Sequence, residues 1–288
     1  MRVLVTGASG FIGSRLVHKL SQMGHEIFCV RRHDGVGAAC GIDVLWDLAS
    51  PAIPQDLPAR IDAVAHLAQA RNYRNFPGDA AEMFRVNVAG TAALLEYAHR
   101  ARASVFCLIS SGTVYEPYSC EIDEGAAVAP TRYLGASKLA AEVLARPYAD
   151  LFAVSILRLF FPYGPRQRER LVPDLIERIR DGLPIQLASD REGLRLVPTF
   201  VDDIVDVIIA ALTQNWHGTF NVAGPAVVSL RELAETIGRA IGRQPTFEIT
   251  DQEASIIVPR LDRLGARLDL NRFTPLEEGI RRTVTPPM

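Results

Sequence analysis

Short apolar runs alternate with longer amphipathic stretches over the first 160 residues of the chain. The short runs are rich in β-branched residues and end at glycine or polar residues, a pattern typical of strands. They are Arg2–Thr6 and residues 26–30, 44–46, 62–67, 104–110 and 152–159. The longer stretches, residues 11–23, 78–102 and 134–145, carry apolar residues at helical spacing. Strands that alternate with helices predict parallel βαβ units and a doubly wound, Rossmann-type α/β sheet.

A glycine-rich loop, TGASGFIG at residues 6–13, lies directly between the first predicted strand and the first predicted helix. Gly7 permits the tight turn out of the strand, Gly10 lets the backbone approach a diphosphate, and Gly13 lets the helix pack close to the sheet. The helix N-terminus then points at the anion. This arrangement predicts a dinucleotide site whose loop also includes Phe11 and Ile12.

The pattern changes after Pro162, where a stretch rich in proline and arginine precedes a predicted helix at residues 171–181. Residues 199–212 and Gly218–Val222 are interpreted as a return to the sheet, and residues 229–241 as a further helix. The sequence therefore predicts a dinucleotide-binding domain and a small, discontinuous C-terminal substrate lobe. The domain comprises residues 1–162 and 197–224, and the lobe comprises residues 163–196 and 225–288.

Residues after the second and third predicted strands bear on the choice of dinucleotide. An acidic residue after the second strand would accept a hydrogen bond from the ribose 2′-hydroxyl of NAD, but Arg31 and Arg32 stand there. A guanidinium pairs well with a 2′-phosphate, so the sequence favours NADP and leaves NAD possible. Asp47, after the third strand, is placed to contact the adenine or to cap a turn.

Composition excludes several classes of function. The net charge is −2 and the pI about 6.3, which gives no electrostatic footprint for nucleic acid. No apolar run reaches the ~18 uncharged residues of a membrane span. The N-terminal apolar stretch is too short for a signal peptide, so we expect a soluble cytoplasmic protein. The four cysteines and six histidines show no CxxC, HxxxH or HExxH spacing, so we propose no metal site.

Several ordered motifs resemble those of the extended short-chain dehydrogenases/reductases, of the NAD(P)-dependent epimerase/dehydratase type that acts on nucleotide sugars. Besides the glycine loop, they are WDL at 46–48, HLAQA at 66–70, NVAGT at 87–91, SSGTVYE at 110–116, LRLFFPYGPRQ at 157–167, FVDDIVDV at 200–207, FNVAGP at 220–225 and PLEEGIRRTV at 275–284. The resemblance covers nearly the whole chain and implies a Rossmann-type sheet, a small substrate lobe and often a homodimer. It also implies that Leu48, Leu67 and Ala68 line the cofactor.

In this family a serine or threonine acts with a Tyr-x-x-x-Lys pair, whose tyrosine exchanges the carbinol proton and whose lysine binds the nicotinamide ribose. The resemblance implies that Ser111 and Thr113 contact the substrate and that Lys138 contacts the cofactor. The position four before Lys138 is Leu134, which cannot transfer a proton. Tyr133 stands five before Lys138, which in a regular α-helix is about 140° away around the axis.

Three explanations of this departure are open. A one-residue π-bulge would bring Tyr133 back to the face of Lys138, and such bulges are common at functional sites. Alternatively, the proton passes to Tyr115, Thr113, Glu116 or water. In the third explanation proton transfer is lost, and the chain binds a cofactor without ordinary oxidoreduction.

The substrate side also departs from the family, which usually has asparagine where this chain has Phe161, so the pocket floor would be apolar. Arg195 and Arg260 are candidates to clamp a diphosphate, because arginine suits bidentate phosphate contact. The sequence thus predicts an NAD(P)-dependent epimerase, dehydratase or keto-reductase for a nucleotide sugar. The alternatives are a reductase or tailoring enzyme for a non-nucleotide carbonyl compound, and a cofactor-binding protein without ordinary oxidoreductase activity.

Overall fold

The computed structural model describes residues 1–32, 40–50, 52–118 and 122–285, and the chain divides into two compact units. The first unit comprises Met1–Pro117, Ala127–Arg158 and Val205–Phe220. The second comprises Tyr118–Ala126, Leu159–Ile204 and Asn221–Met288. The assignment of cofactor binding to one domain and substrate binding to the other stays a prediction.

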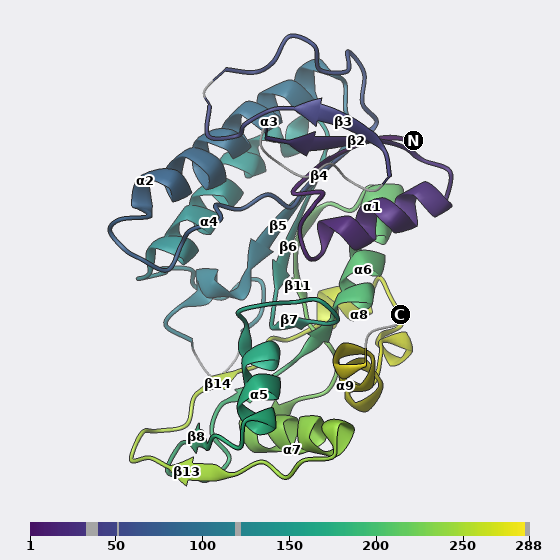
Figure 1. Ribbon diagram of the computed structural model, residues 1–288. Helices are drawn as coiled ribbons and strands as arrows, with labels where there is room; N and C mark the ends of the chain where they lie inside the picture. The colour runs from purple at the N-terminus through teal and green to yellow at the C-terminus, as the bar shows by residue number, and fades with distance from the viewer. Residues whose placement is uncertain (33–39, 51, 119–121, 286–288) are drawn as a thin grey trace. The chain divides into compact units, whose positions relative to one another are not determined.

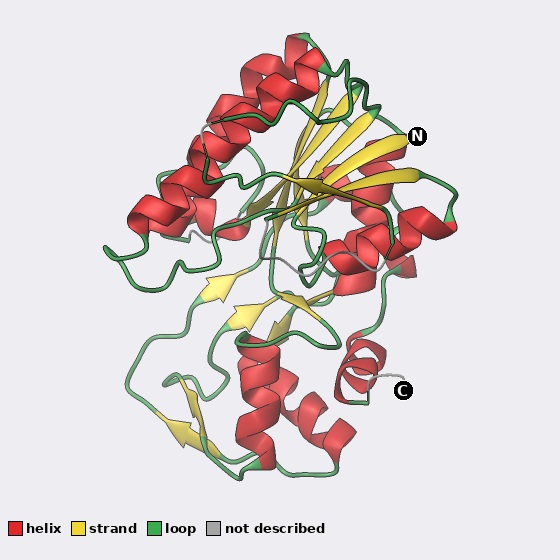
Figure 2. Ribbon diagram, turned by 45° about the horizontal axis from the view of Figure 1, so that its top comes forward, coloured by secondary structure: helices red, strands yellow, loops and turns green. Residues whose placement is uncertain are grey.

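A seven-stranded parallel sheet forms the middle of the first unit, in the order β3-β2-β1-β4-β5-β6-β11 (Figures 1 and 2). Its strands are β1 (Arg2–Thr6), β2 (Glu26–Arg31), β3 (Ile42–Leu45), β4 (Ala63–His66), β5 (Val105–Ser111), β6 (Ala153–Leu159) and β11 (Gly218–Val222). In the ladder, Val5 lies opposite Cys29 of β2 on one side and Ala65 of β4 on the other. This order confirms the predicted Rossmann-type sheet, and it brings the carboxyl ends of β1, β4 and β5 to one edge.

Helices cover both faces of this sheet (Figures 1 and 2). The helical segments are α1 (Gly13–Gln22), α2 (Ala80–Met83), the π-helical η1 (Phe84–Ala89), α3 (Gly90–Arg100), the 3₁₀ turns η2 (Gly112–Tyr115) and η3 (Arg146–Asp150), α4 (Tyr133–Ala145) and α6 (Val201–Thr213). On one face lie α1 and the part of α6 that belongs to this unit, joined by an ion pair between Lys19 and Asp206. On the other face, α3 and α4 enclose a core with the strands, around Leu94, Phe106 and Ala141.

Residues 199–212 were interpreted as a return to the sheet, and this prediction is wrong for most of the segment. Only the short strand β10 (Thr199–Phe200) is extended, and α6 follows it directly. The segment resembles a strand because it is rich in valine and isoleucine. However, Val201, Ile204 and Ile208 fall on one helical face and are fully buried, and aspartates in the first turn favour a helix start.

The second unit contains short strands and helices around a separate apolar core. Its elements are β7 (Pro162–Tyr163), α5 (Leu171–Arg180), β8 (Ile185–Leu187), β9 (Arg195–Leu196), β10, β12 (Val228–Ser229), α7 (Leu230–Ile241), β13 (Phe247–Ile249), β14 (Ile256–Ile257), α8 (Asp262–Gly265), the 3₁₀ turn η4 (Leu270–Arg272) and α9 (Leu276–Val284). The predicted helix at 229–241 is confirmed as α7, which begins with a capping box between Ser229 and Glu232. Its buried residues Leu233 and Ile237 pack in the core with Leu175 and Ile280.

Candidate active site

The glycine loop leaves a cradle that fits a dinucleotide diphosphate. Gly7 has a φ of +68°, and a Cβ built there would lie 3.0 Å from the backbone nitrogen of Ala68. A Cβ on Gly13 would collide with the Gly7 carbonyl oxygen, so only glycine lets α1 begin this close to the loop. Among the described residues, a Cβ on Gly10 would meet only that same carbonyl within 4 Å, so the other side of Gly10 is open. The first-turn N–H groups of α1, including those near Phe11 and Ile12, favour an anion there.

The side chains predicted to select the dinucleotide already have protein partners. Arg31, at the end of β2, places its Nε 2.9 Å from Oδ2 of Asp43 in β3. Arg32 is exposed, and residues 33–39 after it lie outside the described part of the chain. Asp47 accepts a hydrogen bond at Oδ1 from the backbone N–H of Ala49, so it stabilises a turn.

A row of hydrogen bonds runs beneath the glycine loop, and sequence reasoning missed it. The Ala68 N–H donates to Oγ1 of Thr6 at 3.1 Å, and this oxygen lies 2.7 Å from Nδ1 of His66. On the far side of the ring, Nε2 lies 2.8 Å from Oγ1 of Thr91, which donates to the Asn87 carbonyl. The Thr91 hydroxyl hydrogen is used in the bond to the Asn87 carbonyl, so Thr91 can only accept a hydrogen bond from the ring. Nε2 of His66 therefore carries the proton, and Nδ1 accepts from the Thr6 hydroxyl. Burial, aided by the charge of Lys138, lowers the pKa of His66 to about 3, so the ring is neutral.

The π-helical segment η1 holds α4 in place through Asn87. Its amide oxygen accepts from the Ala70 N–H at 2.8 Å, and its amide nitrogen donates to Oγ of Ser137 at 3.0 Å. The Ser137 hydroxyl in turn donates to the Leu134 carbonyl in the first turn of α4. The stretch predicted as one helix over residues 78–102 consists of three helical segments. Its π-helical segment, η1, carries Asn87 and so holds the first part of α4 in place.

α4 itself is a regular α-helix, so the π-bulge proposed to rescue Tyr133 is not present. The helix begins at Tyr133, and the Ala136 N–H donates to the Arg132 carbonyl with ordinary four-residue spacing. The Tyr133 ring packs instead against Phe76, with ring centroids 5.5 Å apart. Leu134 occupies the position one turn before Lys138.

Lys138 lies at the sheet edge between α4 and β5. It is 5% exposed, and its Nζ donates to the Ile109 carbonyl of β5 at 3.1 Å. Burial lowers the pKa of Lys138 to about 8, although the Glu142 carboxylate one turn further along α4 opposes the shift.

Two hydroxyls lie at the carboxyl end of β5, where the sequence placed them. Oγ of Ser111 accepts from the Thr113 backbone N–H at 3.2 Å and from the Thr113 hydroxyl at 3.0 Å. The other proposed proton carriers are engaged elsewhere. The Tyr115 ring is 3% exposed, with the Arg158 guanidinium 4.6 Å from its centroid, and Glu116 lies 3.9 Å from Arg132.

A buried ion pair underlies these residues. Glu142 has no exposed surface and accepts from Nε of Arg158 at 3.0 Å and from Nη2 at 2.6 Å. The Ser110 hydroxyl donates to the same carboxylate at 2.5 Å. The pair joins α4 to β6 and β5, which fixes the helix that carries Lys138.

The three predicted substrate contacts, Phe161, Arg195 and Arg260, belong to the second unit. Phe161 has a φ of +39°, a left-handed conformation that is strained for an aromatic residue. Arg195 is exposed on β9, and Nε of Arg260 lies 2.8 Å from Oδ2 of Asp262. Their roles toward a substrate stay predictions.

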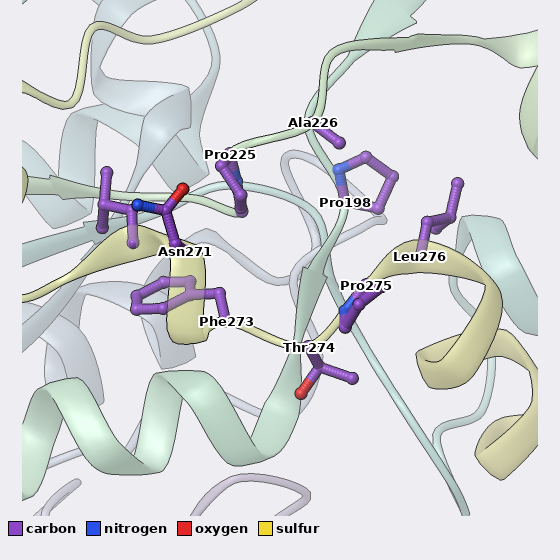
Figure 3. A pocket seen from close by; sticks show the side chains of 10 residues that line it. Pro198, Pro225, Ala226, Asn271, Phe273, Thr274, Pro275 and Leu276 are labelled. Carbon is purple, nitrogen blue, oxygen red and sulfur yellow. The ribbon is translucent and has the colours of Figure 1, made fainter.

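The same unit has an open pocket of about 240 Å³ that none of the predicted residues lines (Figure 3). Its lining is mostly apolar and consists of Pro198, Gly224, Pro225, Ala226, Leu270, Asn271, Phe273, Thr274, Pro275 and Leu276. Thr274 is already bonded to Asp203 through its N–H and its hydroxyl. The pocket therefore offers little reactive chemistry.

Comparison with known proteins identifies the family. A family model described as the NAD dependent epimerase/dehydratase family matches residues 3–223. The chain belongs to this family. A UDP-glucose 4-epimerase of Mycolicibacterium smegmatis is 30% identical over 307 aligned positions, which cover 99% of this chain and 97% of that protein. UDP-glucuronic acid decarboxylase 1 of Arabidopsis thaliana is 25% identical over 308 positions, covering 99% of this chain and 69% of that protein. The solved structure of MoeE5 in complex with UDP-glucuronic acid and NAD is 26% identical, with a TM-score of 0.84 and coverage of 99% and 98%.

Membership of the NAD dependent epimerase/dehydratase family confirms the resemblance stated from the motifs. The predicted preference for NADP finds no support, because the similar solved structure contains NAD. No helix in the described part of the chain is long and apolar enough to cross a membrane. Within residues 1–32, 40–50, 52–118 and 122–285, no three His, Cys, Asp or Glu side chains are grouped so that they could hold a metal ion.

Proposed function

We propose that this chain is an NAD-dependent enzyme that oxidises and re-reduces a carbinol carbon of a UDP-sugar, with 4-epimerisation as its reaction. The observation that carries this proposal is the arrangement in the first unit. The glycine loop follows β1, and the Ser111 and Thr113 hydroxyls and the Lys138 amine stand at the end of β5. The similarity to a UDP-glucose 4-epimerase over nearly its whole length supports the substrate class.

The residues divide the work by their chemistry. The cradle at Gly7, Gly10 and Gly13 would hold the diphosphate of NAD, which supplies the acceptor and donor of hydride when bound. Oγ of Ser111 accepts two hydrogen bonds from Thr113, so its own hydrogen is available to donate to a substrate oxygen. Donors fixed in this way favour the state in which that oxygen gains negative charge.

The cofactor we propose is NAD. The Arg31 guanidinium is already paired with Asp43, which weakens the argument that it awaits a 2′-phosphate. The similar MoeE5 structure holds NAD, and this supports the same choice. Phe161, Arg195 and Arg260 remain the proposed contacts to the sugar and its diphosphate.

Leu134 favours a second candidate function, which is cofactor binding without oxidoreduction. No phenol occupies the position one turn before Lys138, and the Tyr133 ring packs against Phe76. Under this alternative, NAD and UDP-sugars bind but no hydride is transferred.

A single experiment separates the two candidates. The purified chain is loaded with NAD and mixed with UDP-glucose or UDP-glucuronic acid, and nicotinamide reduction is followed at the absorbance of NADH. Nucleotide-sugar products are then resolved by chromatography, and binding is measured by calorimetry. Transient reduction with formation of a 4-epimer supports the enzyme, whereas binding without either signal supports the second candidate. Absence of NAD binding would contradict both.

We also propose a cytoplasmic homodimer. Phe84 on η1 and Val143 on α4 are 53% and 52% exposed, and apolar helix faces of this kind commonly pair. The described cysteines Cys29, Cys40 and Cys107 are free thiols, as expected in a reducing compartment. Light scattering of the wild type and of Val143→Glu tests the dimer, because the charge should yield monomers.

A further inference from the structure

We propose that Lys138 is itself the proton carrier of this site and exchanges a proton directly with the sugar hydroxyl held at Ser111 and Thr113. This inference rests on the proposed function, since oxidation of a carbinol requires a group that takes the hydroxyl proton. It assigns to the lysine a step that Leu134, one turn earlier on the helix, cannot perform.

The geometry leaves few other groups for this step. Tyr133 packs against Phe76, and Tyr115 is buried beside the Arg158 guanidinium. The His66 ring is held between two threonines in its neutral form. Glu142 is fully buried and bonded to both Arg158 and Ser110. Each of these side chains already packs against, or is bonded to, other groups of the protein.

The Lys138 amine, by contrast, lies near the carboxyl end of β5, where the Ser111 and Thr113 hydroxyls are. Its described hydrogen bond goes to the Ile109 carbonyl, and an ammonium has two further N–H groups. Lys138 bonds the backbone carbonyl of Ile109, and Ser111 lies two residues further along β5, about 6.6 Å away along the strand. A sugar oxygen bonded to Ser111 therefore lies within reach of a four-carbon side chain that ends next to Ile109.

The surroundings of Lys138 permit it to lose its proton near neutral pH. Burial lowers its pKa to about 8, so roughly a tenth of the molecules hold a neutral amine at pH 7. The charged group that opposes this shift is Glu142 on the same helix, and Arg158 from β6 neutralises it. His66 from β4 is neutral, and Asn87 from η1 and the hydroxyls of β5 and η2 carry no charge.

The hydroxyl proton of the sugar passes to the lone pair on Nζ, the two electrons of the adjacent C–H bond leave with that hydrogen as hydride to the oxidised nicotinamide, and the carbon becomes a carbonyl. In the return step the hydride comes back to either face of this carbonyl, and an Nζ–H bond gives its proton to the oxygen. The reaction needs no further oxidant or base.

The composition of the chain makes the proposal directly measurable. The chain contains two lysines, Lys19 and Lys138, among 31 lysine and arginine residues. Lys19 is partly exposed and paired with Asp206, so Lys19→Arg leaves one lysine without touching the site. Arginine does not deprotonate in proteins, so an amine kept at this buried position is chemically distinct from the basic residues elsewhere.

The first measurement is a titration. Lys19→Arg protein labelled with ¹⁵N at the lysine side chain is followed by NMR from pH 6 to 11, with and without NAD. The single signal should titrate near pH 8, more than two units below the ordinary value of about 10.4. A midpoint above pH 10 would overturn the proposal whatever the enzyme's activity.

The second measurement compares Lys138→Arg, which keeps the charge, with Lys138→Met and with Lys19→Met as the control. NAD affinity is measured by calorimetry, and hydride transfer is measured at saturating NAD. Both Lys138 variants should lose roughly 10²–10⁴-fold in hydride transfer. The wild-type rate should rise with pH through the midpoint seen by NMR, and small primary amines should restore part of the Lys138→Met rate.

The outcomes separate this proposal from the proposed function. If the wild type transfers hydride and Lys138→Arg does so equally well, the enzyme assignment stands and the role of Lys138 is refuted. If the wild type binds NAD and UDP-sugar but transfers no hydride, the enzyme assignment fails, and this proposal fails with it. Loss of rate in Lys138→Met without any rescue by amines, together with an unchanged pH profile in Lys138→Arg, would also refute it.

Discussion

Replacing Arg158 with methionine should destabilise the first unit strongly. The change removes the guanidinium that bonds both oxygens of Glu142, whose side chain has no exposed surface. Ser110 at 2.5 Å and Arg146 at 3.4 Å remain as described partners, and Arg146 is half exposed. Loss of one member of a buried ion pair costs about 3–5 kcal/mol. At about 2–4 °C per kcal/mol, the melting temperature should fall by roughly 6–20 °C.

Tryptophan fluorescence gives a local readout of this loss. The two tryptophans of the chain, Trp46 and Trp216, are both buried and both belong to the first unit. Unfolding in urea followed at their emission therefore reports this unit rather than the second.

A matched control is Arg100→Met, which breaks an exposed pair with Glu96 on α3 and should cost at most about 0.5 kcal/mol. The double variant Glu142→Gln with Arg158→Met should recover part of the loss, because no buried charge is left unpaired. An Arg158→Met variant within 1 kcal/mol of wild type would refute the reasoning, as would a double variant less stable than the single one.

The remaining predictions concern the cofactor and the proton. Gly10→Val should abolish NAD binding in calorimetry while circular dichroism stays native, because its branches enter the open side of the loop; retained affinity would contradict the loop assignment. Arg31→Ala should change NAD affinity less than about threefold, and a tenfold loss would show that the pair with Asp43 orders the adenosine site. Tyr133→Phe should leave hydride transfer unchanged, whereas Leu134→Tyr should raise it at pH 6–7 by placing a phenol one turn before Lys138. The pKa of Lys138 is lower in the folded chain, so the unfolded chain binds more protons between pH 8 and about 10.4. Stability to urea should therefore rise with pH over this range, by up to about 1.4 kcal/mol per pH unit. Lys138→Met should remove this rise.

Sequence patterns were sufficient for the sheet and for the strand–glycine loop–helix arrangement at its start. Strand runs such as Arg2–Thr6 have a local signal, because β-branched residues end at glycine and a helical period begins directly afterwards. The three-residue glycine spacing at Gly7, Gly10 and Gly13 is likewise local. The prediction failed for α6, because its valines and isoleucines favour a strand by residue type although they also recur at helical spacing.

The hydrogen bonds within the site could not be predicted, because they join residues that are far apart in the chain. Thr6 and His66 are 60 positions apart, and Asn87 and Ser137 are 50 apart. The missing tyrosine at Leu134 was visible in the sequence, but the geometry needed to choose between its explanations was not. Only the regular turn at the start of α4 excludes the π-bulge, and only burial shows that Tyr115 is committed elsewhere.

The row of hydrogen bonds beneath the glycine loop has a definite polarity. An amide N–H of Ala68 at one end can only donate, and the carbonyl of Asn87 at the other can only accept, so Thr6, His66 and Thr91 between them must all point the same way. If one of these three side chains reversed its hydrogen bonds, two hydrogens would face each other on one side of it and two lone pairs would face each other on the other side. The surface beneath the loop therefore keeps one pattern of donors and acceptors over the physiological pH range. A dinucleotide bound there, as we propose, would meet a surface that does not need to reorient.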